Sequence, residues 1–357
     1  MWLISKVQKV HSNYENSNRN ISLDILKGIA IFCVVWGHFI QQGTLSAINF
    51  QENPVFQLIY SFHMPLFMLI SGYLMYQSIN KRTLLQQWIH WGKTLVLPLL
   101  SWTIIANLFI LICHYVKFGS IIGFTINIMQ YWFIISLLAC GILATILKKL
   151  FNNRTSVFLL ILLIIFITGI NSFSMGWMFP FFVGGYIAGK YSHKITQNPH
   201  LITVICLILY PILLMFYTPT TLWYSSFISI SDIILGSPIN ITIENWFTSI
   251  SINAYKILTG FAGCGFMYCV VKLLLKINAP SITAILAWLG THSLTIYFVQ
   301  RVIIEILFGK YLYSSNILVY DFVFTFGLAI IATIFFAFIG ECIKKNTTLN
   351  TILCGGR

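Results

Sequence analysis

Charged residues are scarce in this sequence of 357 residues. Asp, Glu, Lys and Arg together make up 8% of the chain, whereas soluble domains average about 25%. Hydrophobic residues make up 58% of the chain and aromatic residues 16%. A soluble protein of this length needs far more polar surface than these few charges can supply. The composition therefore excludes a soluble globular protein and predicts an integral membrane protein.

Acidic residues are the scarcest charged residues, with 8 Asp and Glu against 21 Lys and Arg and a net charge of +13. In a soluble protein, such an excess would favour nucleic acid as a partner. Here the basic residues stand between long apolar runs, which is the pattern of loops that face the cytoplasm in membrane proteins. We therefore expect no nucleic-acid partner, and we expect a lipid bilayer around the chain.

The eight cysteines lack the paired Cys-x-x-Cys spacing of zinc and redox sites. Most of them fall inside apolar runs, as Cys33, Cys113, Cys140 and Cys206 do. A cysteine in such a run behaves as a small hydrophobic side chain. The sequence therefore predicts neither a metal site nor a disulfide framework.

Long apolar runs recur along the whole chain. A transmembrane helix needs about 20 apolar residues, and about 17 to 25 are tolerated. The runs are Leu23–Ile40, Phe56–Tyr76, Thr94–Tyr115, Ile126–Leu147, Ser156–Ile170, Met175–Gly189, Leu201–Tyr217, Ile252–Leu275, Ile282–Val299 and Leu318–Gly340. They predict an all-α polytopic membrane protein with about ten transmembrane helices.

The basic residues predict how these helices are oriented. If the N-terminus is cytoplasmic and ten helices alternate in direction, all but four of the 21 Lys and Arg residues lie on the cytoplasmic side. The four exceptions are Lys117, Lys256, Arg301 and Lys310. We therefore expect both termini in the cytoplasm. The expected division is a cytoplasmic N-terminal segment over 1–20, a membrane-embedded domain over 21–343 and a cytoplasmic C-terminal tail over 344–357.

The first predicted helix carries ionisable residues on one face. Lys27 and His38 are 11 residues apart, which is three helical turns plus about 20°, and about 16 Å along the axis. Asp24, Gly28, Gln41 and Gln42 fall on or near the same stripe. Ionisable groups inside a membrane are costly, and by default they indicate function. This stripe is expected to face a cavity; the alternative is a histidine that packs against a neighbouring helix.

The second predicted helix carries His63, two residues before Pro65. His38 and His63 both lie in the outer half of the membrane, on helices joined by a short loop. A neutral imidazole can accept a proton near neutral pH, as a general base must. Two such histidines suit an enzyme, and they equally suit a proton-coupled transporter.

Several sequence motifs resemble those of the membrane-bound acyltransferase 3 family. Residues 23–38 (LDILKGIAIFCVVWGH) are similar to its first-helix signature, and FHMPLF at 62–67 with SGYL at 71–74 to its second. Weaker matches follow in the family order, at YWFI (131–134), PFFVGGY (180–186) and LGTHSLTIY (289–297). The resemblance covers roughly residues 20–340.

This resemblance implies a multi-pass enzyme of the bacterial cytoplasmic (inner) membrane. Such enzymes take an acyl group, usually acetyl, from cytoplasmic acyl-CoA. They pass it to a hydroxyl of a surface polysaccharide or of its lipid-linked precursor. Acetyl-CoA is then the donor substrate, a glycan or lipid-linked oligosaccharide is the acceptor, and no cofactor is bound permanently. Two residues depart from the family pattern, because Lys27 stands in place of the commoner Arg and Gln300 in place of a frequent His.

The resemblance implies that His38 is the family's essential histidine and that Lys27 is its basic partner. Acyl transfer from a thioester to an alcohol needs a base on the hydroxyl or a nucleophile that first carries the acyl group. We expect His38 to act as that base or transient carrier, with His63 orienting it or sharing its proton. Lys27, together with Asp24, is expected to bind CoA phosphates. The alternatives are a salt bridge between Lys27 and Asp24, or a Lys27 side chain that extends to the membrane interface.

Acceptor-side roles fall on four further residues. Trp132 is predicted to stack on a sugar, although a tryptophan at a membrane interface is common. Ser71 can supply a hydroxyl or allow close packing. Arg301 and Glu305, spaced i,i+4, are predicted to line the acceptor entrance, with a structural ion pair as the alternative. The alternative function is a proton-coupled transporter or flippase for a glycan or lipid-linked sugar, with His38 and His63 as its proton relay.

Overall fold

The computed structural model describes residues 20–43, 50–121, 123, 125–127, 129–152, 154–168, 174–192, 199–223, 242–277, 279–307 and 320–356. All regular secondary structure in these ranges is helical, which confirms the predicted all-α class. The predicted N-terminal segment lies outside the described residues except for Asn20. The chain divides into two compact units, and each is described by itself.

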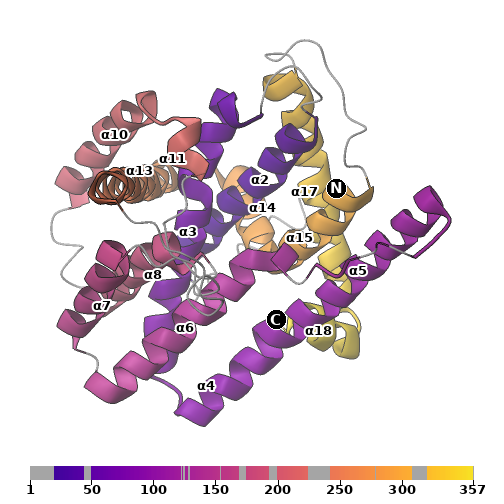
Figure 1. The fold of residues 1–357 in the computed structure, drawn as a ribbon, viewed down its shortest axis with the longest axis horizontal. Helices are drawn as coiled ribbons and strands as arrows, with labels where there is room; N and C mark the ends of the chain where they lie inside the picture. The colour runs from indigo at the N-terminus through magenta and orange to yellow at the C-terminus, as the bar shows by residue number, and fades with distance from the viewer. Residues whose placement is uncertain are drawn as a thin grey trace. The chain divides into compact units, whose positions relative to one another are not determined.

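The first unit holds Met1–Ile59, Ile89–Tyr131 and Val270–Arg357. Its helices are α2 (Ile21–Gly43), η1 (Phe50–Glu52), η2 (Gly92–Val96), α5 (Leu97–Phe118), η3 (Met129–Tyr131), α14 (Pro280–Thr291), α15 (Ser293–Gln300), η4 (Arg301–Leu307), η5 (Tyr320–Thr325), α17 (Phe326–Lys344) and α18 (Thr347–Cys354). α2 packs against α14, α15 and α17, and α18 packs against α5 and α17 (Figure 1).

The second unit holds Tyr60–Trp88 and Trp132–Cys269. Its helices are α6 (Trp132–Phe151), α7 (Thr155–Thr168), α8 (Met175–Lys190), α10 (Pro199–Met215) and α11 (Pro219–Trp223), with most of α3 (Pro54–Ile79), α4 (Leu84–Trp91) and α13 (Ile243–Lys276). α8 packs against α6 and α7.

Several helices are long and apolar enough to cross a membrane. Among the described residues, six segments meet this test: Ile21–Gln42, Pro54–Ile79, Leu84–Phe118, Met129–Phe151, Ile243–Lys276 and Phe322–Lys344. A seventh candidate is the pair Pro280–Thr291 and Ser293–Ile306, which is bent by 67°. Thr155–Thr168 and Val204–Met215 are apolar but shorter. The chain is thus a multi-pass membrane protein, while the count of ten and the orientation stay predictions.

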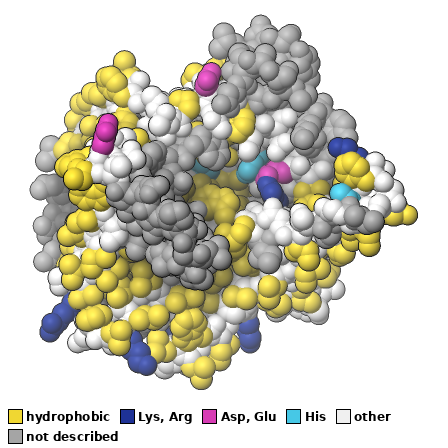
Figure 2. Space-filling view, viewed as in Figure 1, with side chains coloured by type: hydrophobic (Ala, Val, Ile, Leu, Met, Phe, Trp, Pro, Cys, Tyr) yellow, Lys and Arg dark blue, Asp and Glu magenta, His cyan; other side chains and the backbone are white. Residues whose placement is uncertain are grey.

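The outer surface of the helices is apolar. Figure 2 shows hydrophobic side chains over much of the face viewed. On α5, Ile104, Leu108 and Ile112 follow one another at i,i+4 spacing, and each is more than half exposed. In water such a stripe would favour aggregation, whereas lipid tails are a suitable surrounding for it. The stripe therefore indicates a lipid-facing surface.

Two glycines bring the backbones of α2 and α14 together. A Cβ atom on Gly28 would lie 1.9 Å from the carbonyl oxygen of Leu286, and one on Gly290 would lie 1.8 Å from that of Asp24. No side chain fits at either position, so the contact requires glycine. Small residues allow such close helix approach in membranes, and contacts between Cα–H and a carbonyl oxygen recur at these crossings.

The second unit contains a matching pair of glycines between α3 and α8. A Cβ on Gly72 would meet the carbonyl oxygen of Phe182 at 2.0 Å, and one on Gly185 would meet that of Leu69 at 1.9 Å. Gly28, Gly72, Gly185 and Gly290 all lie in motifs that the sequence analysis singled out. These parts of the motifs therefore specify helix packing rather than chemistry.

Candidate functional site

The imidazole of His38 faces a carboxylate in the first unit. Nδ1 of His38, on α2, lies 3.4 Å from Oε1 of Glu305, on η4. The other carboxylate oxygen of Glu305 pairs with a guanidinium nitrogen of Arg301, one turn earlier. The side chain of Glu305 is 9% exposed and that of His38 is 18% exposed. The three side chains form a cluster that is largely shielded, with Glu305 buried deepest between His38 and Arg301, which is 25% exposed.

The local helix geometry supports this cluster. Arg301–Leu307 is π-helical, and π-helical turns are rare and often found at functional sites. The Nε atom of Arg301 and the Oε1 atom of Gln300 are both buried, and neither has a hydrogen-bond partner among the described residues. Buried polar atoms are normally paired. These two atoms therefore remain able to bond to a substrate.

Contacts of Trp36 with η5 and α17 hold the C-terminal half of α2. Nε1 of Trp36 donates a hydrogen bond to Oγ1 of Thr325 at 3.1 Å. The Trp36 ring also packs edge-on against Phe326, with ring centroids 4.9 Å apart. Because Trp36 precedes His38 by two residues, these contacts restrict the rotation of α2 about its axis. The direction in which His38 points is thereby set.

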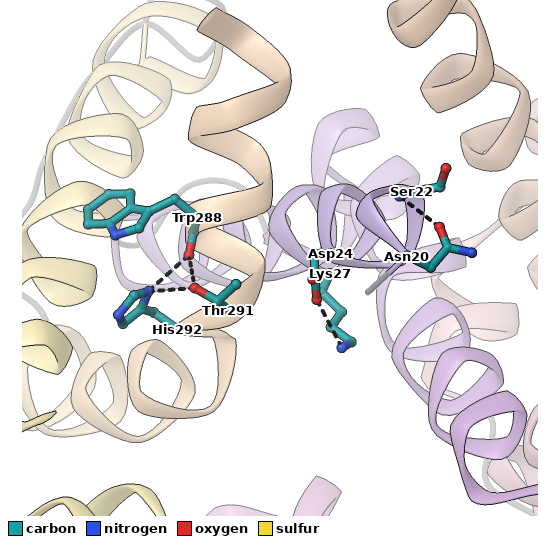
Figure 3. A network of polar contacts seen from close by, with 7 residues as sticks. All are labelled: Asn20, Ser22, Asp24, Lys27, Trp288, Thr291 and His292. Carbon is teal, nitrogen blue, oxygen red and sulfur yellow. Dashed lines mark hydrogen bonds and ion pairs between the residues drawn. The ribbon is translucent and has the colours of Figure 1, made fainter. Parts of the chain in front are cut away.

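At the other end of α2, Lys27 pairs with Asp24. Nζ of Lys27 lies 3.3 Å from Oδ1 of Asp24 (Figure 3), and the side chains are 20% and 2% exposed. The salt bridge considered as the alternative for Lys27 is thus present, and the ammonium is still partly accessible. Gly28, which the periodicity placed on the same polar stripe, lies in the contact with α14 instead.

The bend between α14 and α15 is organised by His292. Its Nδ1 atom lies 2.9 Å from Oγ1 of Thr291 and 2.9 Å from the carbonyl oxygen of Trp288 (Figure 3). The indole of Trp288 in turn donates to Glu341 at 2.7 Å. The bond to Trp288 uses a backbone carbonyl group near the end of α14, where a helix leaves carbonyl groups without helical partners. The geometry gives His292 a structural role.

In the second unit, His63 and Ser71 both lie on α3. His63 is 2% exposed, and its ring packs edge-on against Tyr60 with centroids 4.6 Å apart. Ser71 is half-buried and precedes Gly72, which forms the close contact with α8. A pairing of His63 with His38 would join the two units, and it stays a prediction.

Trp132, on α6, belongs to an aromatic and cationic cluster in the second unit. Its ring centroid lies 6.1 Å from that of Trp177, on α8. On α13, Nζ of Lys256 lies over the Trp177 ring at 4.2 Å from its centroid. Lys256 is 7% exposed. The sequence analysis named Lys256 only as one of four basic residues on the predicted outer side. That unusual position was the one feature of the sequence that pointed to this cluster.

A family model described as an acyltransferase domain matches residues 20–342. The chain belongs to the acyltransferase 3 family. The recognition from sequence motifs is therefore confirmed, and the acyltransferase domain covers nearly the whole chain.

Two curated relatives of this acyltransferase 3 family member are nodulation proteins NolL. The protein from Mesorhizobium japonicum is 35% identical over 152 residues, which cover 40% of this chain and 39% of the relative. That from Sinorhizobium fredii is 34% identical over 140 residues, 38% of this chain and 37% of the relative. The chain thus spans about two fifths of the length of the curated relatives it matches. No solved structure matches it.

In this acyltransferase 3 family member, the contacts between the predicted site residues differ from the groups that the sequence analysis predicted. It brings Arg301 and Glu305, which were predicted at an acceptor entrance, to the expected base His38. It pairs Lys27 with Asp24. The contact between His38 and Glu305 joins positions far apart in the sequence, so no local pattern could reveal it.

Proposed function

We propose that this chain is an O-acetyltransferase of the bacterial inner membrane. It would move an acetyl group from cytoplasmic acetyl-CoA to a hydroxyl of a surface polysaccharide or of its lipid-linked precursor. Membership of the acyltransferase 3 family supports the acyl transfer. The observation that carries the proposal is the position of the His38 imidazole against the carboxylate of Glu305.

This arrangement suits general-base catalysis. A carboxylate beside Nδ1 favours the tautomer with the proton on Nδ1, in which Nε2 carries the lone pair that can accept a proton. In the proposed reaction, Nε2 of His38 takes the proton of the acceptor hydroxyl as the oxygen attacks the thioester carbonyl. The carbon–sulfur bond then breaks, and the imidazolium returns the proton to the CoA thiolate. Glu305 stabilises the positive charge of the imidazolium between these steps.

Arg301 fits a second requirement of this chemistry. Negative charge develops on the thioester oxygen during attack, and donors directed at that oxygen lower the barrier. One nitrogen of the Arg301 guanidinium pairs with Glu305, while its buried Nε–H has no partner among the described residues. We assign this N–H as a donor to the developing oxyanion. The same guanidinium would thus hold Glu305 in place and contact the reacting group.

Lys27 is suited to the donor side. Its partly exposed ammonium lies three helical turns from His38 on α2, about 16 Å along the axis. CoA carries its phosphates at one end and its thioester at the other, joined by the long pantetheine arm. An ammonium can bind phosphate as a point charge, although it lacks the planar two-point contact of arginine. Asp24 would orient Lys27 in the absence of CoA. Once CoA binds, the Lys27 ammonium would contact both Asp24 and a CoA phosphate.

The proposal is tested with membranes that contain the full chain, incubated with radiolabelled acetyl-CoA and the glycan of the host cell. Wild-type membranes should label the glycan, and His38→Ala should abolish labelling while the protein accumulates normally. His114→Ala is the matched control, because the His114 ring packs against Phe118 one turn later on α5, and this variant should leave labelling intact. Unchanged labelling with His38→Ala would contradict the mechanism. Movement of the glycan without consumption of acetyl-CoA would instead favour the transporter hypothesis.

A further inference from the structure

A buried lysine in the second unit is not used by the proposed chemistry. Lys256 lies within the apolar helix α13, and its side chain is 7% exposed. Taking an ammonium out of water is costly unless an anion or several acceptors surround it. An ionisable residue inside a membrane therefore needs a partner, and its default interpretation is a functional site.

The partners of Lys256 in the described part of the chain are a carbonyl group and an indole. Nζ donates to the carbonyl oxygen of Leu222, on α11, at 2.8 Å. It also lies over the Trp177 ring, 4.2 Å from the centroid. Within the described ranges, no Asp or Glu lies within ion-pair distance of this ammonium. An ammonium has three donor hydrogens, so two neutral contacts leave part of its binding capacity unused.

The neighbouring aromatic rings suit a sugar. Trp132 and Trp177 are both half-buried, and their rings lie 6.1 Å apart at a tilt of 33°. Indole rings combine an apolar face with a polar N–H and are favoured at binding surfaces for that reason. The pair therefore offers an apolar platform beside a cation, which matches a sugar ring that carries a negatively charged group.

The predicted orientation supports the same interpretation. Lys256 is one of four basic residues that the ten-helix topology places on the outer side, against the general charge asymmetry. A basic residue that is predicted on that side and is buried over the Trp177 ring is better explained by an anionic ligand than by membrane orientation. Surface polysaccharides and their lipid-linked precursors are assembled or displayed on that side.

We propose that Lys256, Trp177 and Trp132 form an acceptor subsite that binds an anionic group on a sugar, either a carboxylate or a phosphate ester. This inference rests on the proposed transfer to a glycan, and it adds the chemical class of the acceptor. The sugar ring would pack on the tryptophans, while the anionic group accepts a hydrogen bond from the Lys256 ammonium, beside the bond to Leu222.

Direct binding tests this subsite without requiring catalysis. The full chain, purified in detergent, is titrated with three probes: decyl glucoside, decyl glucuronide, and a glucose joined to a decyl chain through a phosphate. Wild type should bind at least one anionic probe about ten to a hundred times more tightly than the neutral probe, as expected for a charge-assisted contact. The glucuronide and the phosphodiester separate the two sources of charge.

Variants assign any preference to Lys256. Lys256→Met should remove the preference, and Lys256→Arg should keep most of it. Lys117→Met is the matched control, because Lys117 has the same predicted sidedness but is exposed, and it should leave binding unchanged. Equal binding of all three probes by wild type would overturn the proposal, as would a preference that survives Lys256→Met. Because equal binding of the three probes is measured on wild type, this result would contradict the subsite even if Lys256→Met does not fold.

Failure of the subsite proposal can be distinguished from failure of the proposed acyl transfer. His38→Ala should bind the anionic probes like wild type while failing to acetylate. If anionic probes bind selectively but acetyl-CoA is never consumed, the subsite stands and the acyl-transfer proposal fails. If acetylation proceeds equally on neutral and anionic acceptors, acyl transfer stands and the subsite proposal fails.

Discussion

Glu305 contacts two functional side chains at once, with one carboxylate oxygen 3.4 Å from Nδ1 of His38 and the other paired with Arg301. The carboxylate thus links the expected base to a guanidinium from the preceding turn. In the proposed mechanism these side chains have separate roles, because His38 would contact the substrate and Glu305 would act through His38. Glu305 is accordingly a positioning residue.

Glu305→Gln should lower the turnover number for acetyl transfer, because an amide cannot stabilise the imidazolium of His38 as a carboxylate does. General-base catalysis contributes about 10²- to 10⁴-fold, so we expect His38→Ala to lose that much and Glu305→Gln to lose less, at least about tenfold. Steady-state kinetics on purified protein measure the turnover number and the KM for acetyl-CoA separately. Glu244→Gln, on an exposed turn of α13, is the control. An unchanged turnover number for Glu305→Gln would contradict the role.

Arg301 and Glu305 should be energetically coupled. Breaking a fully buried ion pair costs about 3–5 kcal/mol, but the Arg301 side chain is 25% exposed, so Arg301→Met should lower the free energy of unfolding by about 1–2 kcal/mol. The double variant Arg301→Met/Glu305→Leu should lose less than the two single variants combined. Denaturant unfolding in detergent measures the difference. Strictly additive losses would show that the pair contributes nothing.

Gly290→Ala should destabilise the first unit, because its new methyl group would overlap the carbonyl oxygen of Asp24. Overpacking of this kind costs about 1–3 kcal/mol, and Gly28→Ala should behave in the same way. Gly327→Ala on α17 is the matched control, since a Cβ there meets nothing within 4 Å. That control should be neutral, or should stabilise by up to about 1 kcal/mol. Equal unfolding temperatures for Gly290→Ala and Gly327→Ala would contradict the close contact between α2 and α14.

Two exposed cysteines test the predicted orientation. Cys113 lies near the predicted outer end of α5, and Cys342 lies near the predicted cytoplasmic end of α17; both are exposed. In variants that keep one of these cysteines, a membrane-impermeant maleimide added to spheroplasts should label Cys113 but not Cys342. Inverted vesicles should give the opposite pattern. Labelling of both residues from the same side would mean an even number of membrane crossings between Cys113 and Cys342, and it would contradict the odd number that the ten-helix topology predicts.

Cys354 should resist alkylation while α18 stays docked. Cys354 is 2% exposed, and burial raises the pKa of its thiol, although Thr295 and Lys344 partly lower it. A raised pKa means less reactive thiolate at a given pH, so modification should need a higher pH than for an ordinary thiol. Mass spectrometry after treatment at pH 8 measures this, with Cys342 as the reactive control. Equal rates at Cys354 and Cys342 would show that α18 does not pack as described.

Local sequence patterns predicted much of the architecture. Each of the ten apolar runs contains a described helix, because lipid requires backbone groups to be paired within a segment. The face shared by Lys27 and His38 followed from helical periodicity alone. The motifs also identified the family, since their order along the chain is specific in combination.

Contacts between distant segments could not be predicted in this way. Glu305 meets His38 only because α2 and η4 pack together, and sequence spacing carries no such information. Gly28 was assigned to a polar stripe, although its role depends on the carbonyl group of Leu286. Likewise, the neighbours of Lys256 come from α8 and α11. The sequence indicated only that Lys256 is unusual, as a basic residue on the predicted outer side.

The glycine contact between α2 and α14 has a consequence for biogenesis. α2 leaves the ribosome among the first helices, whereas Leu286 and Gly290 are translated more than 250 residues later. Contacts between such distant segments form late and slowly. The helix that carries His38 therefore lacks this contact through most of synthesis, and the packing around α2 is completed only after α14 has been translated.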